Sequence, residues 1–157
     1  MILEKILVAD DREENRKAAK EVFANADIVG SEAEAIQRIN ENEYDLVITD
    51  MQMEDKYSGL RVVKTALENG AIPYVLSHAG PSHQGVSVSM RPYGEDICNA
   101  KGKENPETWK EAKSRIESAE GVHKNYQEAL LRAKSRRDKV ELDDVIITAM
   151  YFTKEGN

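Results

Sequence analysis

The chain has 157 residues, of which 40% are hydrophobic and 32% charged, and its formal net charge is −7. This length is enough for one domain with a buried core, and the negative charge argues against general nucleic-acid binding. Residues 1–100 hold 10 Lys and Arg against 18 Asp and Glu, so the acidity belongs to the front of the chain. A single cysteine, Cys98, excludes an internal disulfide and a cysteine-rich metal site.

The hydropathy pattern gives no sign of a membrane or export segment. No stretch approaches 18 consecutive apolar residues, so no membrane span and no membrane partner are expected. Glu4 and Lys5 interrupt the apolar start, so no signal peptide is expected. The pattern favours a cytoplasmic chain.

Strand and helix patterns alternate in the first half of the chain. In order, they predict a strand at Lys5–Ala9, a helix at Glu13–Ala24, a short strand at Asp27–Val29, a helix from a Ser31 N-cap to about Asn42, and a strand at Tyr44–Asp50. A helix preceded by Gly59 and stopped by Asn69-Gly70 follows, and then a strand at Ile72–Ser77. This rhythm implies a parallel, doubly wound sheet with right-handed crossovers.

The pattern weakens after this strand. Residues 78–95 are rich in Gly and Pro and are expected to form a loop with at most one short helix or hairpin. A fifth strand is predicted around Asp96–Ala100. Asn105-Pro106 then begins a helix with a capping residue followed by Pro, and this helix turns Trp109 and Ile116 inward.

Residues 121–157 are expected to be a C-terminal extension of a domain that covers residues 1–120. An amphipathic helix is predicted from Val122 to about Arg137. Residues 142–152 fit either an apolar helix or a strand. Their apolar side chains need a cover, which is either the domain itself or a second copy in a homodimer.

Three acidic residues stand at the ends of two apolar runs. Asp10 and Asp11 follow the first predicted strand, and Asp50 ends the strand at residues 44–50. If these strands are parallel neighbours, the three acids meet at the carboxyl edge of the sheet, where open α/β folds bind ligands. Crowded carboxylates repel one another unless a cation lies between them, and such oxygens suit Mg²⁺. The spacing therefore predicts a magnesium site.

The residues around these acids extend the pattern. The chain reads Lys5-Ile-Leu-Val-Ala-Asp-Asp11, then Tyr44-Asp-Leu-Val-Ile-Thr-Asp-Met-Gln-Met53, then Gly59 and Ile72-Pro-Tyr-Val-Leu-Ser77. In this order and spacing, the segments resemble the receiver domain of two-component response regulators. The resemblance covers residue 4 to about residue 80 well and residues 81–120 loosely. It implies a flavodoxin-like, five-stranded parallel sheet of order 2-1-3-4-5.

The resemblance also implies a role for each site residue. Asp50 would be the phospho-acceptor, attacking a phosphohistidine or a small phosphodonor. Asp10 and Asp11 would hold Mg²⁺ directly or through water, together with Asp50 and the backbone carbonyl of Gln52. Ser77 would donate a hydrogen bond to the phosphoryl group, which adds about −1.5 to −2 charge.

The family has a Lys at the end of the fifth strand, and here the sequence departs from the pattern. Lys101 is the first choice and Lys103 the second, because Cys98-Asn-Ala precedes Lys101 like the end of a strand. Gly102 stands where a Pro usually follows this Lys. Glu54 stands where the loop after the acceptor usually has Pro, and no aromatic switch residue is evident on the fifth strand.

The resemblance implies a stand-alone signalling domain that switches a protein-binding surface. Its partners would be a sensor histidine kinase or phosphotransfer protein and a downstream target, with no nucleic acid. Any catalysis would be limited to autophosphorylation from small donors and autodephosphorylation. One alternative is a pseudo-receiver that binds proteins without phosphorylation. Another is a small Mg²⁺-dependent phosphohydrolase using the same acids.

Two other groups of residues carry weaker signals. The spacing of His78, His83 and Cys98 is loose for zinc, and no fourth ligand is evident in the sequence. A basic run near the C-terminus is interspersed with acids and lacks a DNA-binding motif, so a solvated helix face is expected. Its members are Arg132, Lys134, Arg136, Arg137 and Lys139.

Overall fold

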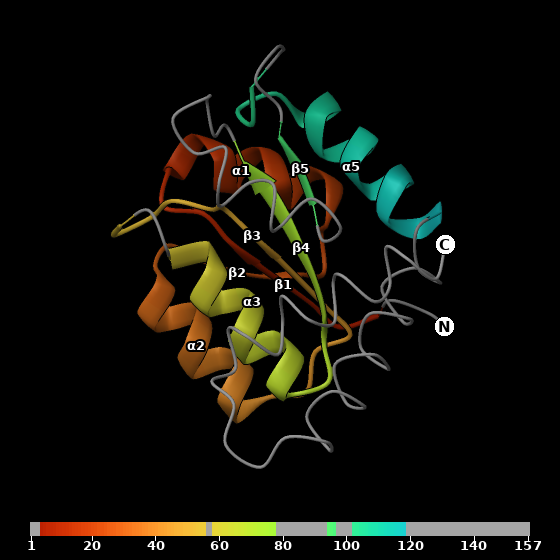
Figure 1. Ribbon diagram of the computed structural model, residues 1–157. Coiled ribbons are helices and arrows are strands. Elements are labelled where there is room, and N and C mark those ends of the chain that lie inside the picture. Colours follow the sequence, from red (N-terminus) through yellow and green to blue (C-terminus); the bar gives the residue numbers. More distant parts are fainter. Residues whose placement is uncertain (1–3, 56–57, 78–93, 97–101, 119–157) are drawn as a thin grey trace.

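A computed structural model describes residues 4–55, 58–77, 94–96 and 102–118. In these ranges a parallel β-sheet lies between two layers of helices (Figure 1). The elements in chain order are β1 (Ile6–Ala9), α1 (Glu13–Val22), β2 (Asp27–Val29), α2 (Glu32–Glu41), β3 (Leu46–Thr49), α3 (Ser58–Glu68), β4 (Ile72–Ser77), β5 (Gly94–Asp96) and α5 (Pro106–Ser118).

The sheet places the first and third strands side by side. The order β2-β1-β3-β4 confirms the α/β architecture and the predicted order of these four strands. The three-residue strand β5 pairs in parallel with β4. Of the fifth strand predicted at residues 96–100, only Asp96 is described. The predicted loop at residues 78–95 is described only at its last two residues, and the C-terminal extension, 121–157, lies outside the described residues.

Among the described elements, two helices cover each face of the sheet. On one face, Val8, Ile48 and Leu76 pack with residues of α1 and α5, among them Trp109. On the other, strand residues pack with residues of α2 and α3. Figure 1 shows α1 and α5 on one side of the strands and α2 and α3 on the other. Successive side chains of a strand point to opposite faces, and helices cover both faces of this sheet. The strands are therefore almost continuously apolar.

The helix ends agree closely with their local signals. Ser31 is the N-cap of α2, and its side chain accepts a hydrogen bond from the backbone N–H of Glu34 at 3.1 Å. Asn105 accepts in the same way from the backbone of Glu107 at the start of α5. Helix α1 ends at Val22, two residues before the predicted end. Among the described helices, none has the length and apolar character needed to cross a bilayer.

Candidate functional site

The register between β1 and β3 brings the three predicted acids together. Ala9 lies opposite Thr49, and the backbone N–H of Asp50 donates to the carbonyl of Ala9 at 2.9 Å. Asp10 and Asp50 therefore leave their strands at the same height of the carboxyl edge. One carboxylate oxygen from each of Asp10, Asp11 and Asp50 lies within 4.8 Å of the other two.

The carboxylate of Asp10 is buried and fully bonded. Its Oδ1 accepts hydrogen bonds from the backbone N–H of Arg12 and from Nδ2 of Asn15, each at 3.0 Å. Its Oδ2 lies 2.6 Å from Nζ of Lys103. Because a buried polar group is costly without partners, these bonds offset the burial of Asp10 and fix the orientation of its carboxylate.

The ammonium of Lys103 lies at the centre of the site. It contacts Asp10 Oδ2 and donates to the backbone carbonyl of Leu76 at 3.1 Å. It also lies 3.1 Å from Oδ1 of Asp50. An ammonium has three donors and no acceptor, so these three oxygens match its hydrogen-bonding capacity. Lys103 joins the ends of β1, β3 and β4.

The first turn of α5 holds the backbone of Lys103 in place. Gly102 has a φ of +74°, a left-handed conformation that glycine adopts without steric cost. Its carbonyl accepts a hydrogen bond from Oγ1 of Thr108 at 2.7 Å, and the carbonyl of Lys103 accepts from Nε1 of Trp109 at 2.7 Å. Trp109 is buried against α1, so the core of the domain positions the lysine.

Asp50 combines burial with partial access to solvent. Its side chain is 13% exposed, whereas Asp11 is an exposed residue. Burial raises the pKa of Asp50, Lys103 lowers it, and the nearby charges of Asp10 and Asp11 raise it again. One lysine therefore offsets only part of the negative charge of three carboxylates. Hard oxygen ligands this close together fit a divalent cation such as Mg²⁺.

The structure describes some of the other predicted site residues and not others. Ser77 is the last residue of β4, so its backbone stands at the edge that carries the acids. Gln52 lies in the loop between β3 and α3, two residues after Asp50. Lys101, the first choice for the family lysine, lies outside the described residues. The structure places the second choice, Lys103, in the site.

Sequence reasoning missed Asn15, which is buried on α1 and binds Asp10. The signal for it is weak but present. Ala18 and Ala19, three and four residues further along the same helix, are buried, so Asn15 is a polar residue on an apolar face. A buried amide needs a partner, and Asp10 is the partner it has.

Comparisons with known proteins give a match to one family and one similar fold. Residues 6–80 match the family model of the response regulator receiver domain. A de novo designed Rossmann 2x3 fold protein, solved by solution NMR, superposes with a TM-score of 0.51 at 25% sequence identity, covering 74% of this chain and 90% of the designed one. A comparison with curated proteins gives no match.

Proposed function

Residues 6–80 belong to the response regulator receiver domain family, and from this premise we propose that the chain is a signalling receiver in which Asp50 accepts a phosphoryl group with Mg²⁺ bound beside it. The cluster of Asp10, Asp11 and Asp50 around Lys103 is the observation that carries the proposal. Carboxylates beside a buried ammonium can bind both a metal ion and a phosphoryl group.

The donors available to the metal ion differ in how far they are already engaged. Both oxygens of Asp10 have protein partners within 3.0 Å, so this residue would bind Mg²⁺ through a water molecule. Asp11 and Asp50, together with the backbone carbonyl of Gln52, would bind it directly. A bound Mg²⁺ would offset the negative charge on the equatorial phosphoryl oxygens.

The transfer itself is a substitution at phosphorus. A carboxylate oxygen of Asp50 attacks the phosphorus of a phosphohistidine, and a P–O bond to Asp50 forms as the P–N bond breaks. The imidazole leaves and takes up a proton from solvent. Lys103, 3.1 Å from Asp50 Oδ1, would pair with the charge of the phosphoryl group, and the Ser77 hydroxyl would donate a hydrogen bond to it.

The same proposal covers partners and the rest of the domain. A sensor histidine kinase or phosphotransfer protein would supply the phosphoryl group in the cytoplasm, and a downstream protein would bind the altered surface. Small phosphodonors such as acetyl phosphate would also react, and the acyl phosphate would hydrolyse at Asp50. We also infer the complete flavodoxin-like order 2-1-3-4-5 for residues 1–120.

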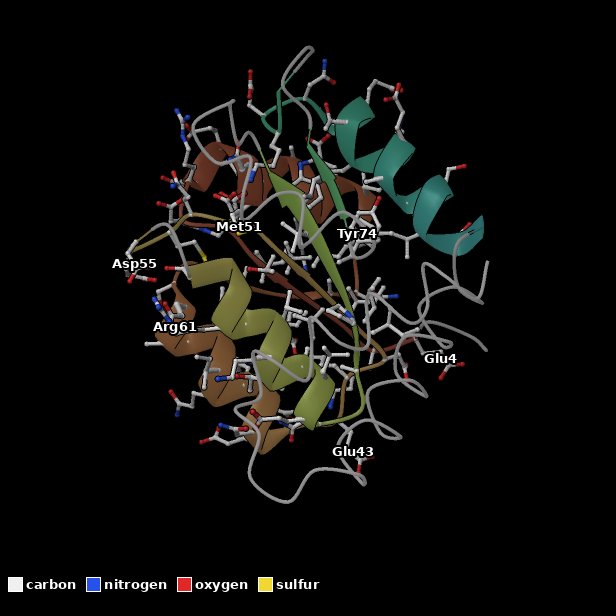
Figure 2. All side chains as sticks on the ribbon, in the orientation of Figure 1. Glu4, Glu43, Met51, Asp55, Arg61 and Tyr74 are labelled. Atoms are coloured by element: carbon white, nitrogen blue, oxygen red, sulfur yellow. The ribbon has the colours of Figure 1, made fainter. Side chains whose placement is uncertain are left out.

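The direct test is adduct formation at Asp50. Acetyl phosphate with Mg²⁺ should add one phosphoryl group, detected by intact mass, and beryllofluoride with Mg²⁺ should change the fluorescence of Trp109, the only tryptophan. Both effects should be absent in Asp50→Asn. They should persist in Glu43→Gln, which removes an exposed carboxylate at the opposite end of the sheet (Figure 2).

The remaining outcomes identify the alternatives. A wild-type chain that responds to neither reagent would be a pseudo-receiver that binds its partners without phosphorylation. Steady hydrolysis of a phosphate ester without a stable adduct would indicate a phosphohydrolase. Either result would overturn the proposal.

A further inference from the structure

The loop that follows Asp50 is joined to the start of helix α2 by charged side chains. Glu54, at the position where the receiver resemblance leads one to expect Pro, has both carboxylate oxygens within 3.1 Å of the backbone N–H of Glu32. This N–H belongs to the first turn of α2 and has no partner inside its own helix. Glu54 therefore serves as a second cap of α2, beside Ser31.

Arg61 of α3 completes this connection. Its guanidinium binds both carboxylate oxygens of Glu32, at 2.6 and 2.7 Å, and it also binds Oδ2 of Asp55 at 2.6 Å. The labels in Figure 2 place Asp55 and Arg61 together at the side of the molecule where Met51 lies. We call Glu32, Glu54, Asp55 and Arg61 the loop clamp.

Hydrogen bonds at the start of α3 fasten the other side of the same loop. The N–H of Gly59 donates to the carbonyl of Met51 at 2.8 Å, and the N–H of Asp55 donates to Oγ of Ser58 at 3.1 Å. Gln52 stands between these fixed points. The conformation of its backbone therefore depends on how firmly the loop is held to α2 and α3.

We infer that Arg61 and Glu54 are positioning residues for metal binding: the loop clamp fixes the loop that carries the backbone carbonyl of Gln52, two residues after Asp50. This inference rests on the proposed function. Outer-shell groups that orient metal ligands change metal affinity about 10- to 100-fold when removed. The clamp acts indirectly, through the backbone of a loop, so an effect at or below the lower end of that range is expected.

The positive charge of Arg61 allows loss of positioning to be distinguished from a direct electrostatic effect on Mg²⁺ affinity. Arg61 is a cation and repels Mg²⁺, so the loss of this repulsion alone would strengthen Mg²⁺ binding. Loss of positioning would instead weaken Mg²⁺ binding. The ion pair is also partly exposed, with Arg61 40% accessible, so its loss should change global stability little.

The experiment is a calorimetric Mg²⁺ titration of the full chain as wild type, Arg61→Gln, Glu32→Gln and the double variant. We expect each single variant to bind Mg²⁺ about 3- to 10-fold more weakly. The double variant should lose no more than either single one, because the two residues act through one another. Arg61→Lys keeps the charge but not the two-pronged contact and should be intermediate.

The matched control is Lys17→Gln, which removes the same charge from an exposed pair on α1, 3.9 Å from Glu13. It should leave Mg²⁺ affinity unchanged within about twofold. Wild-type affinity in Arg61→Gln would overturn the loop-clamp inference alone. Absence of Mg²⁺ binding in the wild type would overturn the proposed function as well. Should Arg61→Gln fold poorly, Arg61→Lys tests the same contact without a change of charge.

Discussion

Lys103 and Asp10 form a buried ion pair, with 2.6 Å between Nζ and Oδ2 and with both side chains at most 2% exposed. The two residues are 93 positions apart in the sequence, so the contact ties the segment before α5 to the end of β1. Desolvation of two charges is costly, and each is tolerated only because the other is present. The pair links the integrity of the domain to the charge of the candidate site.

Lys103→Met should therefore lower the free energy of unfolding by about 3–5 kcal/mol, because Asp10 would be left buried without its counter-ion. Urea unfolding followed by circular dichroism measures this. Adding Asp10→Asn to that variant should restore part of the loss, since the uncompensated charge is then gone. Lys101→Met is the matched control, and a larger effect there than at Lys103 would contradict the assignment of the site lysine.

Asn15→Ala should cost about 1–3 kcal/mol, because Oδ1 of Asp10 loses the amide donor that lies 3.0 Å away. Asn15→Asp should cost more, since it sets a like charge against Asp10. The control is Asn40→Ala, at an exposed residue of α2 that accepts a weak bond from Asn69 at 3.3 Å. Equal unfolding midpoints for the Asn15 and Asn40 variants would show that the amide has no role in holding Asp10.

The parts of the site that the sequence predicts are those carried by strand ends. Asp10 and Asp50 each follow an uninterrupted apolar run, and neighbouring parallel strands finish at one edge, so the three-acid cluster follows from the local pattern. No comparable signal marks the lysine. The pattern Cys98-Asn-Ala favours a strand end before Lys101, whereas the chain reaches the site through the left-handed turn at Gly102, one residue before Lys103.

Contacts between distant segments account for what the sequence does not predict. Arg61 and Glu32 are 29 residues apart, and nothing in either local pattern pairs them. In the sequence, Glu54 is only a departure from the family pattern. Its role follows from the structure, in which it accepts a hydrogen bond from the backbone of α2. Such side-chain pairs depend on how two helices pack on the sheet, which is decided by the whole fold.

The phenol of Tyr44 predicts an alkaline limit to stability. Its hydroxyl donates to Oδ2 of Asp27 at 2.6 Å, and burial, followed by this bond, raises the pKa of Tyr44 to about 12. In the unfolded chain the pKa is about 10. Between these values the unfolded state binds fewer protons than the folded state, so the free energy of unfolding falls as pH rises.

Stability from this group is thus complete below pH 10 and is lost progressively from about pH 10 to 12. Relative to Tyr44→Phe, the wild type should lose about 1 kcal/mol between pH 9 and pH 11. Urea unfolding at a series of pH values measures this difference, in which contributions from the other tyrosines and the lysines cancel. A constant difference between the two proteins across that range would contradict the raised pKa.

The start of α3 leaves no room at residue 59 for any residue larger than glycine. A Cβ there would lie 2.5 Å from the carbonyl oxygen of Asp50 and 2.6 Å from Cα of Met51. Both neighbours are backbone atoms, so no rotamer change relieves the contact. Gly59→Ala should therefore lower the free energy of unfolding by about 1–3 kcal/mol and displace the backbone on which Asp50 stands. Its beryllofluoride response should be weakened or lost.

Gly70→Ala separates this effect from the general cost of adding a methyl group. Gly70 has a φ of +76°, and no atom would lie within 4 Å of a Cβ added there, so its substitution introduces only backbone strain of about 1–2 kcal/mol. The two variants should therefore be similar in stability and different in reactivity. Of these two glycines, only Gly59 would bring an added methyl group against the Asp50 backbone. A normal beryllofluoride response in Gly59→Ala would therefore contradict the view that the position of this loop controls the site.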